Sequence, residues 1–151
     1  MEKKRSKVFK KIIKGDNRLR NVVLDTNILI DNVHGFAKWV DEALNKSQEY
    51  QLIVPTIVAA EYFTAQETET PVGYLRSKNY LTLFKTVNFT FEIAEVLGKI
   101  LRRKTYTASA STGDLIIAST AIYLDAELAT RNKVDFSKIP NLRFFEPKRL
   151  N

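Results

Sequence analysis

Short hydrophobic runs alternate with amphipathic segments along most of the chain. The runs typical of strands are residues 21–24, 52–54, 86–89, 127–130 and 142–145. Between them, apolar residues recur at intervals of three and four, which predicts helices. These helices are expected over 26–35, 36–44, 57–63, 74–84, 90–104 and 113–124. Alternating strands and helices predict an α/β protein, a three-layer α/β/α sandwich with a mostly parallel central sheet.

Two of the expected helices differ in the face that they bury. Over residues 93–101 the apolar residues form one stripe, with Thr90 as the N-cap, which is typical of a helix on the surface. Residues 113–124 are apolar nearly all round, with Ser111 or Thr112 as the cap, which predicts a helix deep in the fold.

Trp39 falls on the apolar stripe that begins at Phe36 and is expected to pack in the core rather than stack on a base.

The excess of positive over negative charge lies at one end of the chain. At 151 residues, with 44% hydrophobic and 27% charged residues, the composition is that of one globular domain. The net charge is +7, and residues 1–20 hold nine basic and two acidic residues. The other 131 residues hold 15 of each. We therefore expect a basic arm over 1–20 and a neutral domain over 21–151.

Composition also excludes several classes of protein. The chain has no cysteine, so disulfides, thiolate metal sites and thiol nucleophiles are excluded. No apolar run of about 7–15 residues follows the basic start, so no secretory signal is expected. The apolar runs at 51–60 and 115–124 are far shorter than the roughly 20 residues that cross a bilayer. We expect a cytoplasmic protein with no membrane partner.

Acidic and amide side chains follow the predicted strands. Asp25 ends the first strand, Glu61 lies in the helix after the second, and Asp114 begins the buried helix. Asn132 and Asp135 follow the run that ends at residue 130. In an open parallel sheet, functional groups collect at the carboxyl ends of the strands. The sequence therefore predicts that these five residues share one edge of the sheet.

Several carboxylates in one cleft repel one another unless they are protonated or bound to a cation. A set of oxygen ligands, with no cysteine and no suitably placed histidine, favours a hard divalent ion, Mg²⁺ or Mn²⁺. Such an ion activates water and offsets charge on a phosphate. His34, the single histidine, lies between two helices and is expected at the surface rather than as a general base.

Each acid also has a structural explanation when taken alone. Asp25 is placed to cap the helix that follows it. Asp114 is a first-turn acid of the kind that the helix dipole favours. Asp135 suits a turn or cap. Glu61 is harder to explain this way, because an acid in an apolar segment would face the core unless it bordered a polar cleft.

Four segments together resemble the motifs of the PIN-domain nucleases. Residues 22–31 (VVLDTNILID) resemble the opening motif, and 57–62 (IVAAEY) resemble the second, with its single glutamate. Residues 113–121 (GDLIIASTA) resemble the third and 128–136 (LATRNKVDF) the fourth. The four occur in order over residues 21–145. Size and motif style are similar to the VapC toxins of toxin–antitoxin pairs.

The resemblance implies an α/β/α sandwich and endoribonuclease activity that depends on Mg²⁺ or Mn²⁺. It implies that Asp25 and Asp114 are metal ligands and that Glu61 is a ligand or a water-activating group. Asn132 occupies a position where family members carry Asp or Asn, and Asp135 either supplies the missing charge or orients a metal-bound water. Residues implied to support the site are Thr26, Asn27 and Thr130. An RNA substrate, an antitoxin partner and a homodimer are implied by the resemblance alone.

Two other functions compete with this interpretation. A PIN-like module that binds RNA or protein without cleaving it would be favoured by an incomplete acid set, but three acids are present. A phosphatase of the haloacid dehalogenase type needs a second acid two residues after the first, to protonate the leaving group. Here Asn27 stands at that position.

Basic residues supply candidates for holding the RNA backbone. They are Arg102, Arg103, Lys104 and Arg131. For the first three, a solvated helix end is an equal explanation. The basic arm allows a short amphipathic helix over 7–14, and it either attracts RNA phosphates, docks on a membrane surface or partner, or is simply solvated.

Overall fold

The computed structural model describes residues 19–147, and it places five parallel strands in the order β3-β2-β1-β4-β5. The strands are β1 (Arg20–Leu24), β2 (Tyr50–Pro55), β3 (Lys85–Val87), β4 (Glu127–Ala129) and β5 (Arg143–Phe144). The helices are α2 (Thr26–Val33), α3 (Trp39–Asn45), α4 (Thr56–Tyr62), α5 (Pro71–Leu81), α6 (Phe91–Arg103), α7 (Thr112–Tyr123) and α8 (Lys133–Phe136), with a 3₁₀ turn η1 (Gln66–Glu69).

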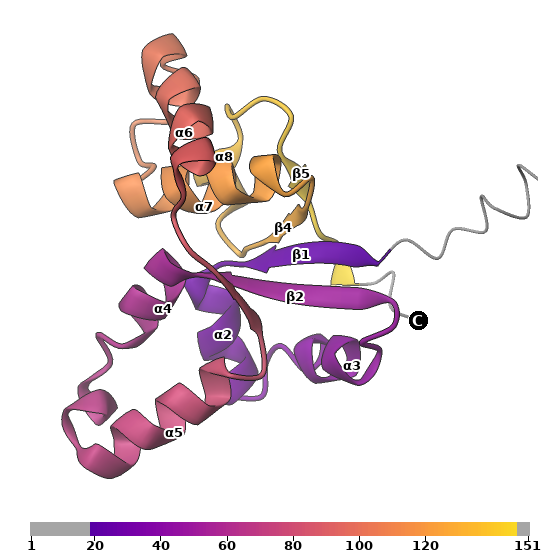
Figure 1. Cartoon of the computed structure of the whole chain (residues 1–151), viewed down its shortest axis with the longest axis vertical. Helices are drawn as coiled ribbons and strands as arrows, with labels where there is room; N and C mark the ends of the chain where they lie inside the picture. Colours follow the sequence, from indigo (N-terminus) through magenta and orange to yellow (C-terminus); the bar gives the residue numbers. More distant parts are fainter. Residues whose placement is uncertain (1–18, 148–151) are drawn as a thin grey trace, which may run out of the picture.

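The strand order explains why helices cover both faces of the sheet. From β1 the chain moves through β2 to β3 in one direction, and then returns to the other side of β1 for β4 and β5. Crossovers between parallel strands are right-handed, so connections that run in opposite directions place their helices on opposite faces. Helices α2–α5 lie on one side of the sheet and α6–α8 on the other (Figure 1). The predicted three-layer α/β/α sandwich is confirmed.

The core is built by β1, β2 and β4 together with α7. Val22, Val23 and Leu24 of β1 are fully buried, as expected for the central strand of a sheet that is covered on both faces. The consecutive residues from 117 to 121 of α7 are also buried. The apolar character of α7 on all sides therefore reflects its burial, as predicted, and Ser111 is its N-cap.

The prediction that Phe36 belongs to a helix core face is wrong. Gly35 adopts a φ of 81° after α2, and the Phe36 N–H bonds to the Asp31 carbonyl at 2.8 Å. This turn leaves Phe36 outside α3 with 82% of its surface exposed, while Ala37 takes the buried position. Trp39 does pack inward, with its ring centroid 4.9 Å from that of Phe145.

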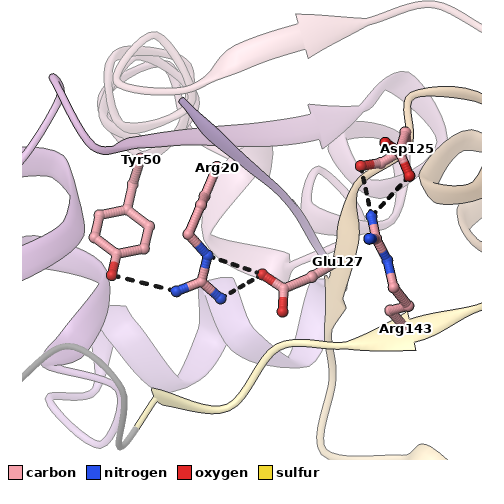
Figure 2. A network of polar contacts seen from close by, with 5 residues as sticks. All are labelled: Arg20, Tyr50, Asp125, Glu127 and Arg143. Carbon is pink, nitrogen blue, oxygen red and sulfur yellow. Dashed lines mark hydrogen bonds and ion pairs between the residues drawn. The ribbon is translucent and has the colours of Figure 1, made fainter. Parts of the chain in front are cut away.

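A polar network joins the starts of three strands at the amino-terminal edge of the sheet (Figure 2). Arg20 of β1 donates to the Glu127 carboxylate of β4 from Nε at 3.2 Å and from Nη2 at 2.5 Å. Its Nη1 reaches the Tyr50 hydroxyl of β2 at 3.5 Å. The guanidinium also lies 5.4 Å from the ring centroids of both Tyr50 and Phe145. Arg20 thus ties β1, β2, β4 and the segment after β5 together.

The first strand starts one residue earlier than the sequence pattern indicated, because Arg20 pairs with Tyr50 in the parallel register. The expected basic arm, apart from its last two residues, lies outside the described residues. Within residues 19–147, no helix has both the length and the apolar character needed to cross a membrane.

Candidate functional site

The carboxyl ends of β1 and β4 meet where the strand order reverses. Leu24 pairs with Ala129, and the Asp25 N–H bonds to the Ala129 carbonyl at 3.0 Å. Asp25 therefore follows β1 at the same level at which Thr130 follows β4. In open parallel sheets, this reversal point is where ligands bind.

Asp25 is buried, with 6% of its surface exposed, and three groups donate to its carboxylate. Oδ1 accepts from the Thr26 N–H at 2.7 Å, which makes Asp25 the N-cap of α2. Oδ2 accepts from the Thr130 hydroxyl at 2.7 Å and from the Asn27 amide at 3.1 Å. The capping interpretation is thus correct, and the same carboxylate is also positioned between two strands.

The charge on Asp25 is costly in this environment. Burial raises the pKa of Asp25, and the nearby charges of Asp114 and Glu61 raise it further. The hydrogen bonds from Thr130 and Thr26 act in the opposite direction but do not cancel the effect of burial. Asp114 and Glu61, on two other elements, therefore lie close enough to act on the charge of Asp25.

Glu61, on α4, lies against the start of α7. The Thr26 hydroxyl donates to its Oε2. A methyl group placed on Gly113 would come within 2.7 Å of Oε1, so the absence of a side chain at Gly113 makes room for this carboxylate. Glu61 is half-buried, and its carboxylate lies beside Thr26 and Gly113 rather than within the apolar core.

Asp114 is held at the start of α7 by a capping box with Ser111. Its Oδ2 accepts from the Ser111 N–H at 2.7 Å and from the Ser111 hydroxyl at 2.8 Å, while its own N–H donates to that hydroxyl at 3.1 Å. Among the described residues, nothing donates to Oδ1 of Asp114 or to Oε1 of Glu61. Each acid therefore retains one oxygen that can bind another group.

Asn132 and Asp135 form a separate pair beside the three acids. The Asn132 amide donates to Asp135 Oδ2 at 2.8 Å, and the Ser109 hydroxyl donates to Oδ1. The backbone N–H of Asn132 donates to the Thr130 hydroxyl at 3.0 Å. Since that hydroxyl donates in turn to Asp25, the pair is linked to the acids through hydrogen bonds.

The predicted basic residues are not gathered around the acids. Arg131 lies near them, but its Nε pairs with Asp31 at 3.2 Å, and its backbone N–H donates to Asn27 at 3.2 Å. Arg102, Arg103 and Lys104 are exposed at the end of α6. His34 is exposed at the end of α2, as expected.

The structure adds three residues that the sequence analysis did not assign to the site. Ser111 was expected only as a helix cap, although its spacing of three from Asp114 is the signature of a capping box. Gly113 is needed for the close approach of Glu61. Ser109 comes from the loop between α6 and α7, and no pattern in the sequence links it to Asp135.

The donor set fits a hard divalent cation. Within residues 19–147, the His, Cys, Asp and Glu side chains as they stand form no ready-made group of three metal ligands. The three acids nonetheless offer only carboxylate oxygens, two of which accept no hydrogen bond, and their mutual repulsion is relieved by a cation. Mg²⁺ usually retains several waters and needs only one or two protein carboxylates.

These features define an α/β protein with an acidic site at the reversal point of a parallel sheet. The family model for the PIN domain matches residues 22–142, and the chain belongs to the PIN-domain family. The resemblance seen in the four motifs is confirmed. No curated protein matches the sequence significantly.

Solved structures agree with this assignment. The chain is similar to one in VapBC2 from Rickettsia felis bound to a DNA fragment from their promoter, with a TM-score of 0.67, 24% identity, and coverage of 83% of this chain and 97% of that one. For DNA-bound VapBC from Salmonella typhimurium the TM-score is 0.68 and the identity 16%, with coverage of 85% of this chain and 99% of that one. For a toxin–antitoxin complex from Klebsiella pneumoniae the TM-score is 0.63 and the identity 29%, with coverage of 83% of this chain and 97% of that one.

Proposed function

We propose that this PIN-domain protein is an endoribonuclease that requires Mg²⁺ or Mn²⁺ and acts as the toxin of a toxin–antitoxin pair. The observation that carries the proposal is the convergence of Asp25, Glu61 and Asp114 at the reversal point of the sheet. Membership of the PIN-domain family supports nuclease chemistry at this site.

Asp25 and Asp114 are the proposed metal ligands, with Glu61 as a third ligand or as the group that takes a proton from water. When bound, the cation would supply Lewis acidity toward the phosphodiester and activate water. Thr130 and Asn27 hold the Asp25 carboxylate in place, and Thr26 holds that of Glu61. Asn132 and Asp135 orient Thr130 and thereby act indirectly on Asp25.

A protein antitoxin and a second copy of this chain are the proposed partners, in the cytoplasm. Support for the antitoxin comes from the similar solved structures, which are described as VapBC or toxin–antitoxin complexes, whereas the second copy rests on the resemblance to VapC toxins alone. Such an arrangement keeps an acidic nuclease site under the control of a binding protein.

The test incubates purified protein with total RNA, with Mg²⁺, with Mn²⁺ and with EDTA, beside the Asp25→Asn variant. Asn is also a good N-cap, so the variant should retain α2 while losing the charge. We expect wild-type cleavage only with a divalent ion, and a loss of at least about a hundredfold in the variant. Asp125→Asn is the matched control, because Asp125 is an exposed acid beyond the end of α7.

Equal cleavage by Asp25→Asn, or cleavage that EDTA does not abolish, would contradict the proposal. If wild-type protein binds RNA but cleaves none with either metal, the non-catalytic binding module is the better description.

A further inference from the structure

A cleft of about 170 Å³ lies between α6, the last turn of α7 and the segment before β5. Its apolar lining consists of Val96, Ile100, Ile122 and Pro140, and its polar lining consists of Lys99, Arg103, Thr105 and Asn141. Ile122 marks its position on α7, eight residues beyond Asp114. At 1.5 Å per residue, about 12 Å of helix separates the cleft from the acidic site.

The cleft carries concentrated positive charge. Lys99 and Arg103 are four residues apart on α6 and so lie on the same face of the helix. In the part of the chain that the structure describes, neither forms an ion pair; the four ion pairs there involve other residues. Two cations that no carboxylate neutralises therefore line one small depression.

Thr105, in the same cleft, has an unusual hydroxyl. Its Oγ1 is the one buried side-chain polar atom among residues 19–147 that has no hydrogen-bond partner. Such a group costs free energy in the folded protein and calls for an explanation. Thr105 lines the cleft, but its Oγ1 is shielded from solvent as it stands. A turn about the Cα–Cβ bond would bring the hydroxyl toward an anion held by the two cations.

We propose that this cleft binds a phosphate group, and that its source is the backbone of single-stranded RNA. Arg and Lys are the side chains that bind phosphate most strongly, by charge-assisted hydrogen bonds. The volume equals that of roughly five or six waters at about 30 Å³ each, which admits one phosphate. The apolar lining residues, which include Val96 and Pro140, can contact the adjoining sugar or base. The site is separate from the acids and does not depend on cleavage.

The test measures binding in EDTA, where no metal-dependent cleavage occurs. A labelled single-stranded oligoribonucleotide is titrated by fluorescence anisotropy, and inorganic phosphate is titrated by NMR at constant ionic strength. We expect Arg103→Gln and Thr105→Val each to weaken RNA binding about tenfold, the value of one hydrogen bond to a charged group. Arg103→Gln should also reduce the salt slope of log Kobs by about 0.7, whereas Thr105→Val removes no charge and should leave it unchanged.

Arg76→Gln is the matched control, because it makes the same charge change at an exposed position of α5, outside the cleft and on the other side of the sheet. We expect it to alter affinity less than about twofold, and we expect no loss of thermal stability in Thr105→Val. If only the phosphate titration responds to the cleft variants, the cleft is a phosphate site whose source is a free phosphate. Equal effects of Arg76→Gln and Arg103→Gln, or no effect of Thr105→Val in either titration, would overturn the proposal.

Discussion

Asp25 serves folding and the proposed chemistry with one carboxylate, and the two uses conflict. As the N-cap of α2 it stabilises the helix through Oδ1. As a buried acid facing Asp114 and Glu61 it destabilises the fold whenever it is ionised, which is why its pKa is raised. Residues selected for a charged site commonly reduce stability in this way.

The raised pKa predicts how stability depends on pH. Between the pKa of an unfolded aspartate, about 3.9, and its own raised value, the folded protein binds more protons than the unfolded chain. Stability must therefore fall as pH rises through this window, and the loss persists at higher pH. Asp25→Asn should lack the loss and melt higher than wild type at pH 7 in EDTA, by about 2–4 °C per kcal/mol of relief.

Thermal unfolding from pH 4 to 8 checks this, with and without Mg²⁺. The difference should shrink toward pH 4, and Mg²⁺ should stabilise wild type but not the variant, because only the former gains a ligand. A variant that melts below wild type at every pH would contradict the account of Asp25.

Gly113 offers a way to disturb the acids without unfolding the protein. A methyl group there would meet Oε1 of Glu61 at 2.7 Å, and the end of this flexible side chain can move aside. Gly113→Ala should leave stability nearly unchanged, since alanine favours the helix, yet lower cleavage by about tenfold or more by displacing Glu61. Cleavage rate and melting temperature are the measurements.

Gly98→Ala is its control, because nothing lies within 4 Å of the added carbon in the middle of α6. It should raise stability by about 0.5–1 kcal/mol and leave cleavage unchanged. A loss of activity in both variants would show that helix content rather than Glu61 is responsible.

At the scale of elements, α7 connects the core to the site. Its middle is buried, and its first turn carries Asp114 in a capping box with Ser111. Ser111→Ala should cost about 1 kcal/mol through loss of the cap. Cleavage should fall as well, because the Asp114 carboxylate loses one of the two groups that hold it.

Denaturant titration and single-turnover cleavage measure the two effects of the Ser111 substitution. Ser111→Thr retains a capping hydroxyl and should recover most of both. If the threonine variant is as impaired as the alanine variant, the capping box does not explain the position of Asp114.

Elements explain which parts of the site were predictable from the sequence. Asp25 and Asp114 follow from strand-end and helix-start patterns, because a parallel sheet brings such positions to one edge. Ser109 does not, since its bond to Asp135 spans 26 residues of sequence from an irregular loop. Phe36 was misassigned because helical spacing alone cannot reveal that Gly35 turns the chain first.

At the scale of the whole molecule, the contacts of Arg20 with Glu127, Tyr50 and Phe145 hold the strands together at the amino-terminal edge of the sheet, opposite the acids (Figure 2). Arg20→Ala should destabilise the protein by about 1–2 kcal/mol, since it removes an ion pair and the packing of the guanidinium on two aromatic rings. Arg143→Ala is the matched control, because Arg143 pairs with Asp125, whose side chain is 74% exposed. It should cost about 0–1 kcal/mol.

Chemical denaturation of the two arginine variants, together with cleavage assays, checks this contrast. Both should cleave RNA at the wild-type rate, because their network lies at the amino ends of the strands. If Arg20→Ala and Arg143→Ala lost equal free energies of unfolding, the contacts of Arg20 with the two aromatic rings would contribute no stability beyond its ion pair.

The basic arm is best tested by deleting residues 1–18, which leaves Arg20 and β1 intact. The deletion removes eight basic and two acidic residues. We expect weaker RNA binding with a flatter salt dependence, by about 0.7 in slope for each phosphate that the arm neutralises, and unchanged metal-dependent cleavage at saturating RNA. Loss of that cleavage in a still-folded protein would show that the arm contributes to the chemistry.

The strand order has a consequence for how the protein is synthesised. Because β4 pairs with β1 and is encoded more than 100 residues later, one edge of β1 remains open while the chain emerges from the ribosome. Until residues 127–130 have been made, the Asp25 carboxylate lacks the hydroxyl of Thr130, and the Asp25 N–H lacks the Ala129 carbonyl to which it donates. A nascent or truncated chain can therefore carry Asp25, Glu61 and Asp114 without holding them in a working arrangement.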